Sequence, residues 1–560
     1  MSTNQTFEQA KHFFLEGLSR FKNGEYEVAE INYRRSLALV PNRESTLSNL
    51  CLALLASNNL NDIEQVVINL NTLFPKNKNH IVLAIEAYSK QKNWNAVLNY
   101  VDQLLELGIP ESSGYHQRAM VLIELRRFSE AITCFDKSVL LNKHNAEAYF
   151  GRGNAYQALG QFEEAVSNYE SALLNSENYF EAYVNRGIAF VEMRLFHRAQ
   201  LSFESAIKLN PTSAEAHFGR GNALAGLGQT REAVNSFQQA INLKSDFADA
   251  YFNKSVNLLL EGDYAEGWRL HEWRWKGDVT NPERNFPVPI WLGGSTLVNK
   301  TILLHAEQGL GDSIQFCRYA KLVKSLGATT LLEVPKGLIG LLSDLDGVDL
   351  LIQSGEPLPP FDYHCPLLSL PLAFNTCINT IPSSGAYLKI NHSKRYKWAH
   401  RLGMKTKPRV GIVWSSTSNY KNDVSRSMCL SSFLEHLPLS DLDLVCLQKE
   451  IKSVDRAHLN LIGDQIKYFG EDLNDFSDTS GLASCMDLVI STCTSVPHMT
   501  AALGIETWLL LAHVPDWRWL KDRDDSPWYE SMKLYRQGCD KEWIPVLRRV
   551  AKDLGVRFGI

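Results

Sequence analysis

The chain has 560 residues, more than one hydrophobic core normally organises, so we expect two to four domains. Its hydrophobic content of 45% and charged content of 21% are ordinary for a globular protein. The formal net charge of −5 gives no electrostatic support to a nucleic-acid partner, because such binding depends on neutralising phosphates.

The cysteines and the apolar runs of the sequence indicate in which compartment the protein is expected. The ten cysteines are scattered without a CxxC pair, so the sequence predicts neither a disulfide framework nor a zinc site. Residues 1–14 lack the basic start and apolar run of a signal peptide. The longest apolar runs, such as 508–512, fall far short of the about 20 residues that cross a bilayer. We therefore expect a cytoplasmic protein without a transmembrane segment.

An internal repeat with a period of 34 residues occupies the first half of the chain. The period aligns a column of small residues (Gly153, Gly187, Gly221, Ser255), an aromatic column (Tyr149, Tyr183, His217, Tyr251) and two further small columns (Ala165, Ala199, Ala233, Gly267; Ala172, Ala206, Ala240). Small residues allow helices to approach closely, and aromatic residues fill the gaps between them. This pattern is typical of tetratricopeptide (TPR) repeats, so we expect an α-solenoid arm over residues 1–276, with seven repeats and a final partial one.

One column of the repeats is basic in five successive units: Arg118, Arg152, Arg186, Arg220 and Lys254. In one interpretation the column binds an acidic or phosphate-bearing acceptor, which makes Arg152, Arg186 and Arg220 candidate acceptor-binding residues. In the other, the side chain packs within the helix pair and only its charged head reaches water. Repetition favours packing, because functional surfaces vary between repeats.

The character of the sequence changes after residue 275. Trp268, Trp273 and Trp275 are expected to cap the arm, and the Pro- and Gly-rich segment 277–299 is expected to be a linker. Beyond it, short apolar runs alternate with helical stretches, which is typical of α/β folds with parallel sheets. We expect two Rossmann-like lobes, at 300–400 and 401–560, with a ligand cleft at the carboxyl ends of their strands.

The predicted elements of the two lobes follow from these patterns. The expected strands are 301–305, 329–334, 349–352, 409–414, 442–447, 488–491 and 507–511, and the expected helices are 312–326, 338–345 and 543–554. Residues 361–372 are expected to form a loop in which Tyr363, His364 and Cys365 point into the cleft.

The segment 305–312, with sequence HAEQGLGD, joins a predicted strand to a predicted helix. Gly309 and Gly311 allow a tight turn, and the helix N-terminus favours a bound anion. Asp312 and Glu307 are candidate general bases at the end of the strand. The simpler interpretations are that Asp312 caps the helix and that Glu307 maintains the shape of the loop.

A second strand-to-helix junction lies at 491–498, with sequence STCTSVPH. Thr494 and Ser495 are placed to cap the helix and to offer hydroxyl and N–H groups to a donor phosphate. His498, one turn later, is a candidate for stabilising charge on a leaving group. Simple capping and a buried core histidine are the alternatives.

Two further clusters complete the predicted donor site. The first follows a strand at 413–427 and contributes hydroxyl and cationic side chains suited to phosphate: Ser415, Ser416, Lys421 and Arg426. The second, at 516–529, combines aromatic and charged residues, with Asp516 and Arg518 expected nearest the cleft. A solvated loop and a packed structural corner are the respective alternatives.

The segments HAEQGLGDSIQFCRY, FDYHCPLLSLP and VGIVWSS, followed by DLVIS and PDWRWL, resemble bacterial TPR proteins that carry a family-9-like glycosyltransferase domain. That domain is related to the heptosyltransferases and similar in plan to TPR-bearing protein O-GlcNAc transferases. The resemblance covers the chain from Trp291 onward as well as the arm. It implies a GT-B pair of lobes and an inverting transfer from a nucleotide sugar that needs neither metal nor cofactor.

The resemblance also implies roles for individual residues. Asp312 matches the family's base, and Thr494, Ser495 and His498 match its donor-phosphate ligands. Similar proteins modify proteins, including flagellins, with the arm recognising the acceptor. Cys493 departs from the heptosyltransferases, which carry an aspartate there, and this makes an ADP-heptose donor less expected.

Two other functions are compatible with the sequence. The chain would act as a TPR scaffold if its glycosyltransferase-like domain only bound a ligand or partner. Alternatively, the same enzyme would act on a glycan or lipid-linked acceptor, with the arm serving assembly. The donor base, the sugar, the acceptor and the oligomeric state are left open by the sequence.

Overall fold

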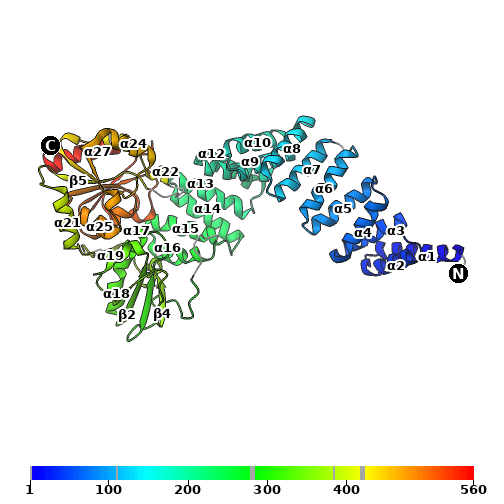
Figure 1. Cartoon of the computed structure of the whole chain (residues 1–560), viewed down its shortest axis with the longest axis horizontal. Coiled ribbons are helices and arrows are strands. Elements are labelled where there is room, and N and C mark those ends of the chain that lie inside the picture. Colours follow the sequence, from blue (N-terminus) through cyan, green and yellow to red (C-terminus); the bar gives the residue numbers. More distant parts are fainter. Residues whose placement is uncertain (1–2, 109–110, 278–283, 383–384, 417–422) are drawn as a thin grey trace. The chain divides into compact units, whose positions relative to one another are not determined.

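The computed structural model describes residues 3–108, 111–277, 284–382, 385–416 and 423–560, and Figure 1 shows the chain coloured from its N-terminus to its C-terminus. The chain divides into two compact units, Met1–Thr212 and Ser213–Ile560. The first unit contains helices, and the second contains further helices and two parallel sheets. The domain boundaries drawn from the sequence stay predictions.

The first unit is a succession of helices in which each helix contacts the next along the chain. They are α1 (Thr3–Lys22), α2 (Tyr26–Leu39), α3 (Glu44–Ala56), α4 (Leu60–Leu73), α5 (Lys78–Lys90), α6 (Trp94–Glu106), α7 (Glu111–Glu124), α8 (Phe128–Leu141), α9 (Ala146–Ala158), α10 (Phe162–Asn175), α11 (Phe180–Glu192) and α12 (Phe196–Leu209).

The repeats continue into the second unit. It begins with α13 (Ala214–Gly226), α14 (Thr230–Leu243), α15 (Ala248–Glu261), the short α16 (Tyr264–His271) and the 3-10 turn η1 (Glu272–Trp275). The described part of the chain thus holds sixteen helices before the first strand, and the eight-residue α16 matches the predicted partial repeat. Among the described residues, no helix has both the length and the apolar content needed to cross a membrane.

The 34-residue period has a direct cause in helix packing. A Cβ atom at Gly187 would lie 2.7 Å from Phe203 Cζ, and one at Gly221 would lie 2.5 Å from Phe237 Cε1. In both pairs the aromatic ring lies on the second helix of the repeat, sixteen residues later, and fills the space that the missing side chain leaves. In these repeats the large ring therefore requires a glycine on the first helix.

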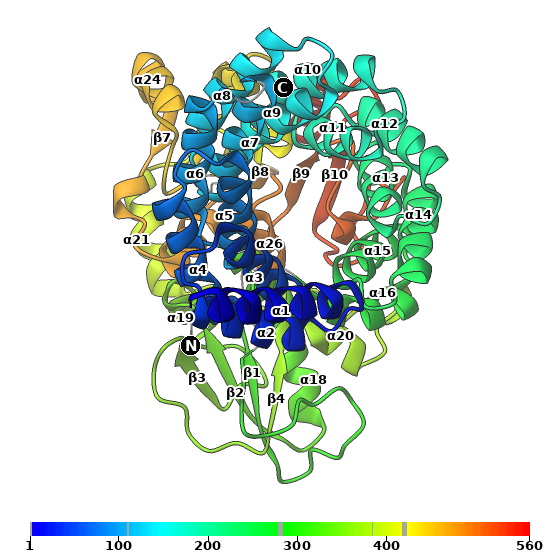
Figure 2. The same cartoon turned by 90° about the vertical axis from the view of Figure 1, so that its right-hand side faces the viewer.

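A four-stranded parallel sheet follows the arm, in the order β3-β2-β1-β4 (Figure 2). Its strands are β1 (Thr301–His305), β2 (Thr329–Val334), β3 (Leu350–Gln353) and β4 (Tyr363–Pro366). Its helical segments are α17 (Leu310–Phe316), η2 (Cys317–Tyr319), α18 (Ala320–Ser325), η3 (Lys336–Leu338), α19 (Ile339–Leu342), η4 (Leu367–Ser369), α20 (Leu370–Ala373) and η5 (Ile378–Thr380).

The prediction of a loop at 361–372 is wrong. Tyr363–Pro366 is the edge strand β4, which pairs in parallel with β1. Cys365 is fully buried in the core and does not face a cleft, while His364 contacts His305 at 3.3 Å between ring nitrogens. The segment shows little apolar alternation, and the sheet neighbour that makes it a strand lies about sixty residues earlier in the chain.

A six-stranded parallel sheet forms the C-terminal part, in the order β10-β9-β8-β5-β6-β7. Its strands are β5 (Arg409–Val413), β6 (Asp443–Cys446), β7 (Ile466–Tyr468), β8 (Leu488–Thr492), β9 (Thr507–Leu511) and β10 (Met532–Arg536). Its helical segments are α21 (His392–Leu402), α22 (Asp423–Arg426), α23 (Leu430–Leu434), η6 (Leu439–Asp441), α24 (Ser453–Ile462), η7 (Gly463–Gln465), η8 (Gly470–Asp472), α25 (Phe476–Ala483), α26 (Ser495–Ala502), η9 (Trp517–Trp519) and α27 (Ile544–Phe558). The edge strands β7 and β10 were not predicted.

The last arm helices share one hydrophobic core with the α/β region. Trp268 of α16 packs edge-to-face on Trp517, with ring centroids 5.1 Å apart, and also contacts Phe316 of α17. Tyr264 contacts Trp528. As predicted, Trp268 closes the array, and the second unit includes the end of the arm because these aromatic side chains are buried together.

Gly187→Ala is expected to destabilise the first unit. Overpacking against Phe203 costs ~1–3 kcal/mol, and the better helix propensity of alanine offsets only about 1 kcal/mol of that. Urea unfolding followed by circular dichroism measures the change. The double variant Gly187→Ala/Phe203→Leu removes the overlapping ring atoms, so it is expected to lose less stability than the sum of the two single variants. Strict additivity would contradict the packing explanation.

Candidate active site

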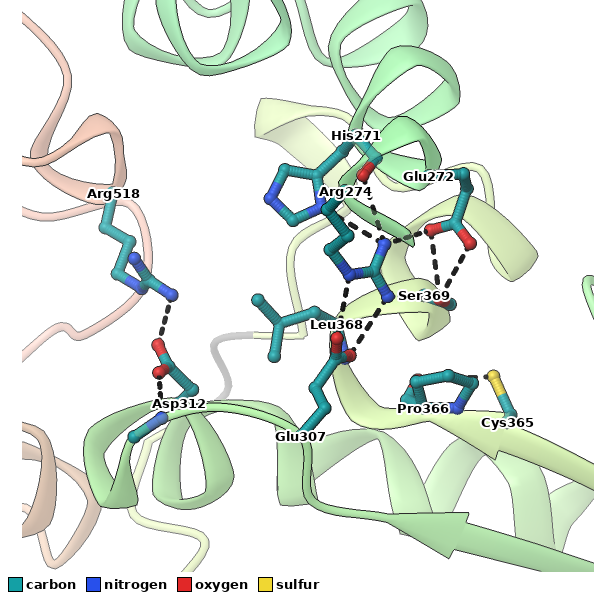
Figure 3. Close-up of polar contacts among 11 residues, drawn as sticks. His271, Glu272, Arg274, Glu307, Asp312, Cys365, Pro366, Leu368, Ser369 and Arg518 are labelled. Carbon is teal, nitrogen blue, oxygen red and sulfur yellow. Dashed lines mark hydrogen bonds and ion pairs between the residues drawn. The ribbon is translucent and has the colours of Figure 1, made fainter. Parts of the chain in front are cut away.

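Asp312 lies in the first turn of α17, where the loop from β1 ends (Figure 3). Its Oδ2 accepts a hydrogen bond from the Gly309 N–H at 2.8 Å, so the carboxylate does hold the helix start, as a capping residue would. Its side chain is 19% exposed. Burial raises the pKa of Asp312, and the charge of Arg518 opposes that shift.

Arg518, in the η9 turn of the C-terminal part of the chain, contacts the Asp312 carboxylate. It pairs with Asp312 Oδ1 and donates to Gln315 of α17 at 2.6 Å and to Asp516 at 2.9 Å. Asp516 also accepts the Arg518 backbone N–H at 3.0 Å, which holds the η9 turn. Asp516 and Arg518 therefore lie beside Asp312, and their side-chain hydrogen bonds within the described chain are to one another and to α17.

Glu307 is buried in an ion pair with the end of the arm. Arg274 of η1 donates to both of its carboxylate oxygens, at 2.7 and 3.0 Å, and the Leu368 N–H donates to Oε1 at 3.0 Å (Figure 3). Burial raises the pKa of Glu307, against the effect of Arg274. With its side chain 3% exposed, Glu307 fixes the loop, and Asp312 is the more accessible of the two candidate bases.

The N-terminus of α26 meets the N-terminus of α17. A Cβ atom at Gly311 would lie 3.5 Å from Ser495 Cα and 3.0 Å from His498 Cδ2, so a glycine is needed for the two helix starts to approach. Thr494 occupies the N-cap position, yet within the described part of the chain its buried hydroxyl has no hydrogen-bond partner. A buried hydroxyl without a partner at a helix N-terminus suits an anionic ligand.

His498 is buried behind this junction. Its Nδ1 lies 2.9 Å from the Tyr529 hydroxyl, and its ring packs 5.2 Å from that of Trp519. Burial, together with the charges of Arg518 and Arg318, lowers the pKa of His498 well below its ordinary value. The imidazole is therefore neutral near pH 7, and its Cδ2–Nε2 edge faces Gly311.

Cys493 lies between Thr494 and the end of β8. The Trp519 indole N–H donates to its sulfur at 3.2 Å. Burial and the charge of Asp516 raise the pKa of the thiol to about 11, while the charges of Arg426 and Arg518 act in the opposite direction. Both guanidinium groups thus lie near Cys493, and the thiol is protonated at neutral pH, which makes it a poor nucleophile.

The loop after β5 is held by Gln448. Its side-chain oxygen accepts the Trp414 N–H at 2.8 Å, and its nitrogen donates to the Ser415 hydroxyl at 3.3 Å. Ser415 is 3% exposed, which leaves it little contact with a ligand. Arg426 donates to the Ser416 hydroxyl at 3.5 Å. Lys421 lies outside the described residues.

The basic column of the arm bonds within the arm. Each side chain reaches a partner sixteen residues away: Arg118 to Asp102 and Cys134, Arg152 to Asp136 and Asn168, Arg186 to Ser202, Arg220 to Ser236, and Lys254 to Gln238. These contacts account for the recurrence of the column, because the same geometry returns in each helix pair. The acceptor-binding role of Arg152, Arg186 and Arg220 stays a prediction.

The structure thus brings the Asp312 carboxylate and Arg518 together and places the N-terminus of α26, with Thr494 and Ser495, against the first turn of α17. The positioning residues that sequence reasoning did not single out are Arg274, Gln315 and Gln448, whereas Trp519 and Tyr529 lie in the predicted cluster at 516–529. Of the three, Arg274 lies in the tryptophan-rich stretch at the end of the arm. Among the described residues, no cluster of three metal-ligating side chains occurs.

Comparison with protein-family models identifies the repeats. A model described as TPR repeat matches residues 153–193 and 221–254, and models described as tetratricopeptide repeat match residues 112–145 and 184–230. The repeats are tetratricopeptide repeats. The TPR prediction is therefore confirmed for the arm, whereas the glycosyltransferase resemblance remains a prediction.

Relatives of the chain are distant. It is 24% identical over 331 residues to Protein FlbA of Caulobacter vibrioides, with 54% of each chain covered, so it spans about half the length of this relative. Solved structures similar to part of the chain include YrrB, a TPR protein with an unusual peptide-binding site, at 24% identity, covering 31% of this chain and 89% of YrrB, with a TM-score of 0.29. Another is a TPR protein from Parabacteroides merdae, at 15% identity, covering 45% of this chain and 99% of that one, with a TM-score of 0.35.

Cys493 is expected to resist alkylation at pH 7.5. Its pKa of about 11 leaves it protonated, whereas Cys377 and Cys429 are exposed and their neighbouring hydroxyl and N–H groups lower their thiol pKa. Iodoacetamide labelling of the folded protein, followed by peptide mass spectrometry, compares the three rates. If Cys493 is labelled as fast as Cys377, the prediction that its thiol is unreactive is wrong.

Proposed function

We propose that this chain is a glycosyltransferase of GT-B type that moves a sugar from a nucleotide-activated donor to a protein side chain. The observation that carries the proposal is the meeting of two loops: Asp312 on one, and the uncapped α26 N-terminus with Thr494 on the other. A base and an anion site side by side are what such a transfer requires.

In the proposed reaction the acceptor oxygen attacks the anomeric carbon as the bond from that carbon to the donor phosphate breaks. The acceptor proton passes to the Asp312 carboxylate. Although Asp312 accepts from Arg518 and Gly309, a carboxylate has about four lone-pair sites, so it retains capacity for a proton. Its raised pKa makes it a stronger base than an exposed aspartate.

The charge that develops on the departing phosphate requires donors that are already in place. Thr494 offers its hydroxyl, and Ser495 offers the N–H of the first residue of α26, where the helix dipole is positive. The Arg426 guanidinium adds a positive charge nearby. Neutral His498 contributes by packing and orientation, since its low pKa excludes a permanent positive charge at neutral pH.

Recognition of a protein acceptor is assigned to the arm. TPR arrays stack helix pairs into an extended concave surface that suits an extended peptide. Arg186 is half-buried and donates to the Ser202 hydroxyl, and no carboxylate of the described chain lies within ion-pair distance of it. Arg220 likewise donates to the Ser236 hydroxyl. In the proposed function an acidic acceptor residue pairs with Arg186 or Arg220.

Asp312→Asn is expected to lower sugar transfer ~10²–10⁴-fold, because the amide no longer accepts the proton, while nucleotide binding is retained. Purified protein is incubated with a panel of nucleotide sugars, and donor hydrolysis and the mass of candidate acceptor proteins are followed. Asp346→Asn, which removes an exposed carboxylate paired with Lys389, is the matched control.

The outcomes of this experiment separate the three candidate functions. If the wild type turns over no nucleotide sugar and both variants match it, the chain is a binding scaffold. Turnover with a sugar-bearing glycan or lipid product in place of a protein product would contradict the assignment of the acceptor.

Arg518→Gln is expected to move the acid limb of the kcat/KM profile to higher pH. Activity needs ionised Asp312, so it is lost as pH falls through the Asp312 pKa; Arg518 lowers that pKa, and its removal raises it. Rates over pH 5–9 measure the shift. Arg523→Gln, whose partner is the surface residue Asp525, is expected to leave the limb in place. An unmoved limb in Arg518→Gln would show that Asp312 is not the titrating base.

A further inference from the structure

The last turn of the arm carries a buried arginine, Arg274, which contacts residues of the α/β region. Arg274 lies in η1 and is 3% exposed, and it donates to both carboxylate oxygens of Glu307 on the loop after β1 (Figure 3). The two-pronged geometry fits a guanidinium and no other cationic side chain.

The other N–H groups of the Arg274 guanidinium are also hydrogen-bonded. Arg274 donates to Glu272 at 2.7 Å, to the Ser369 hydroxyl at 2.8 Å and to the His271 carbonyl at 3.2 Å. The Ser369 hydroxyl in turn donates to Glu272 at 2.9 Å. The network is closed, so Arg274 holds Glu307 in one place relative to η1 and η4.

Glu307 is five residues before Asp312 in the chain, and the loop between them is anchored at its two ends by different parts of the chain. At one end Arg274 of the arm holds Glu307, and at the other Arg518 of η9 holds Asp312. Between these anchors, residues 308 and 309 are exposed. A displacement of Glu307 is therefore expected to reach Asp312 through a turn of four residues, of which Gly311 packs against His498 and Ser495.

We propose that Arg274 is a positioning residue for Asp312: through Glu307, the last turn of the TPR arm sets the place of the candidate base. The proposal rests on the proposed function for its catalytic consequence, but the placement of the loop is a property of the chain without substrate. It also gives the arm a role in the chemistry that is separate from acceptor recognition.

The first test measures the loop without any substrate. Arg274→Lys keeps the charge but loses the two-pronged contact, so backbone amides of 306–312 are expected to exchange hydrogen at least about tenfold faster. Amides of β5 and β8 serve as internal references. Arg523→Lys is the matched control, because it changes a two-pronged contact of the same kind, to Asp525, at a surface site outside this loop.

The second test measures sugar transfer. Arg274→Lys and Glu307→Gln are each expected to lower kcat about tenfold or more while KM for the donor stays within about twofold, because a displaced base affects the chemical step. Arg523→Lys is expected to leave kcat unchanged. Ser369→Ala, a milder change in the same network, supplies the result if Arg274→Lys fails to fold.

The outcomes are distinguishable. Unchanged exchange at 306–312 in Arg274→Lys and Glu307→Gln, or equal acceleration in Arg523→Lys, overturns the positioning role. Faster exchange together with an unchanged kcat also overturns it, since the loop then moves without affecting the base. If the wild type transfers no sugar at all, the proposed function fails, while the exchange comparison still decides whether Arg274 holds the loop.

Discussion

Charge that is buried at the junction of the arm and the two sheets must be paired, and this requirement organises the second unit. Arg274 and Arg518 are nearly inaccessible to water, and each is matched to carboxylates from another part of the chain. An unpaired charge in such a place costs several kcal/mol, so the partners are held together once the surrounding aromatic core excludes water. The position of the loop that carries Asp312 is a consequence of these pairings.

The electrostatics of the candidate site follow from the same burial. His498 stays neutral near pH 7 because it is buried against Trp519 and Tyr529 and lies near two guanidinium groups, and burial keeps the Cys493 thiol protonated. Among the described residues, the Thr494 hydroxyl at the α26 N-terminus has no hydrogen-bond partner. In the proposed function this hydroxyl and the helix dipole stabilise negative charge.

The arm illustrates how one packing rule produces several sequence columns. A glycine on the first helix requires a large ring sixteen residues later, and the same spacing joins each basic side chain to its partner. For this reason the repeat was readable from the sequence. The regular spacing of the basic column is explained by these contacts within the arm. Regularity is therefore no evidence that the column binds an acceptor.

In the α/β region, strands with continuous apolar runs were predicted closely, and β1, β2 and β9 have the expected bounds. The edge strands β4, β7 and β10 were not predicted, because none of them contains a continuous apolar run: their sequences are YHCP, IKY and MKLYR. The loops that bear Asp312 and Thr494 were recognised as strand-to-helix junctions. That Gly311 packs against Ser495 and His498 was not foreseen, since it depends on how the two sheets meet.

By itself, the sequence determined the TPR arm, the parallel α/β character of the second half and the residues available for chemistry, because periodicity and local apolar runs are properties of neighbouring residues. Only the tertiary structure decided which of those residues meet. It turned Glu307 from a candidate base into an anchor, joined Arg518 to Asp312, and enclosed His498 and Cys493 so that both are neutral. Burial and long-range ion pairing set these outcomes, and both depend on contacts between segments tens to hundreds of residues apart.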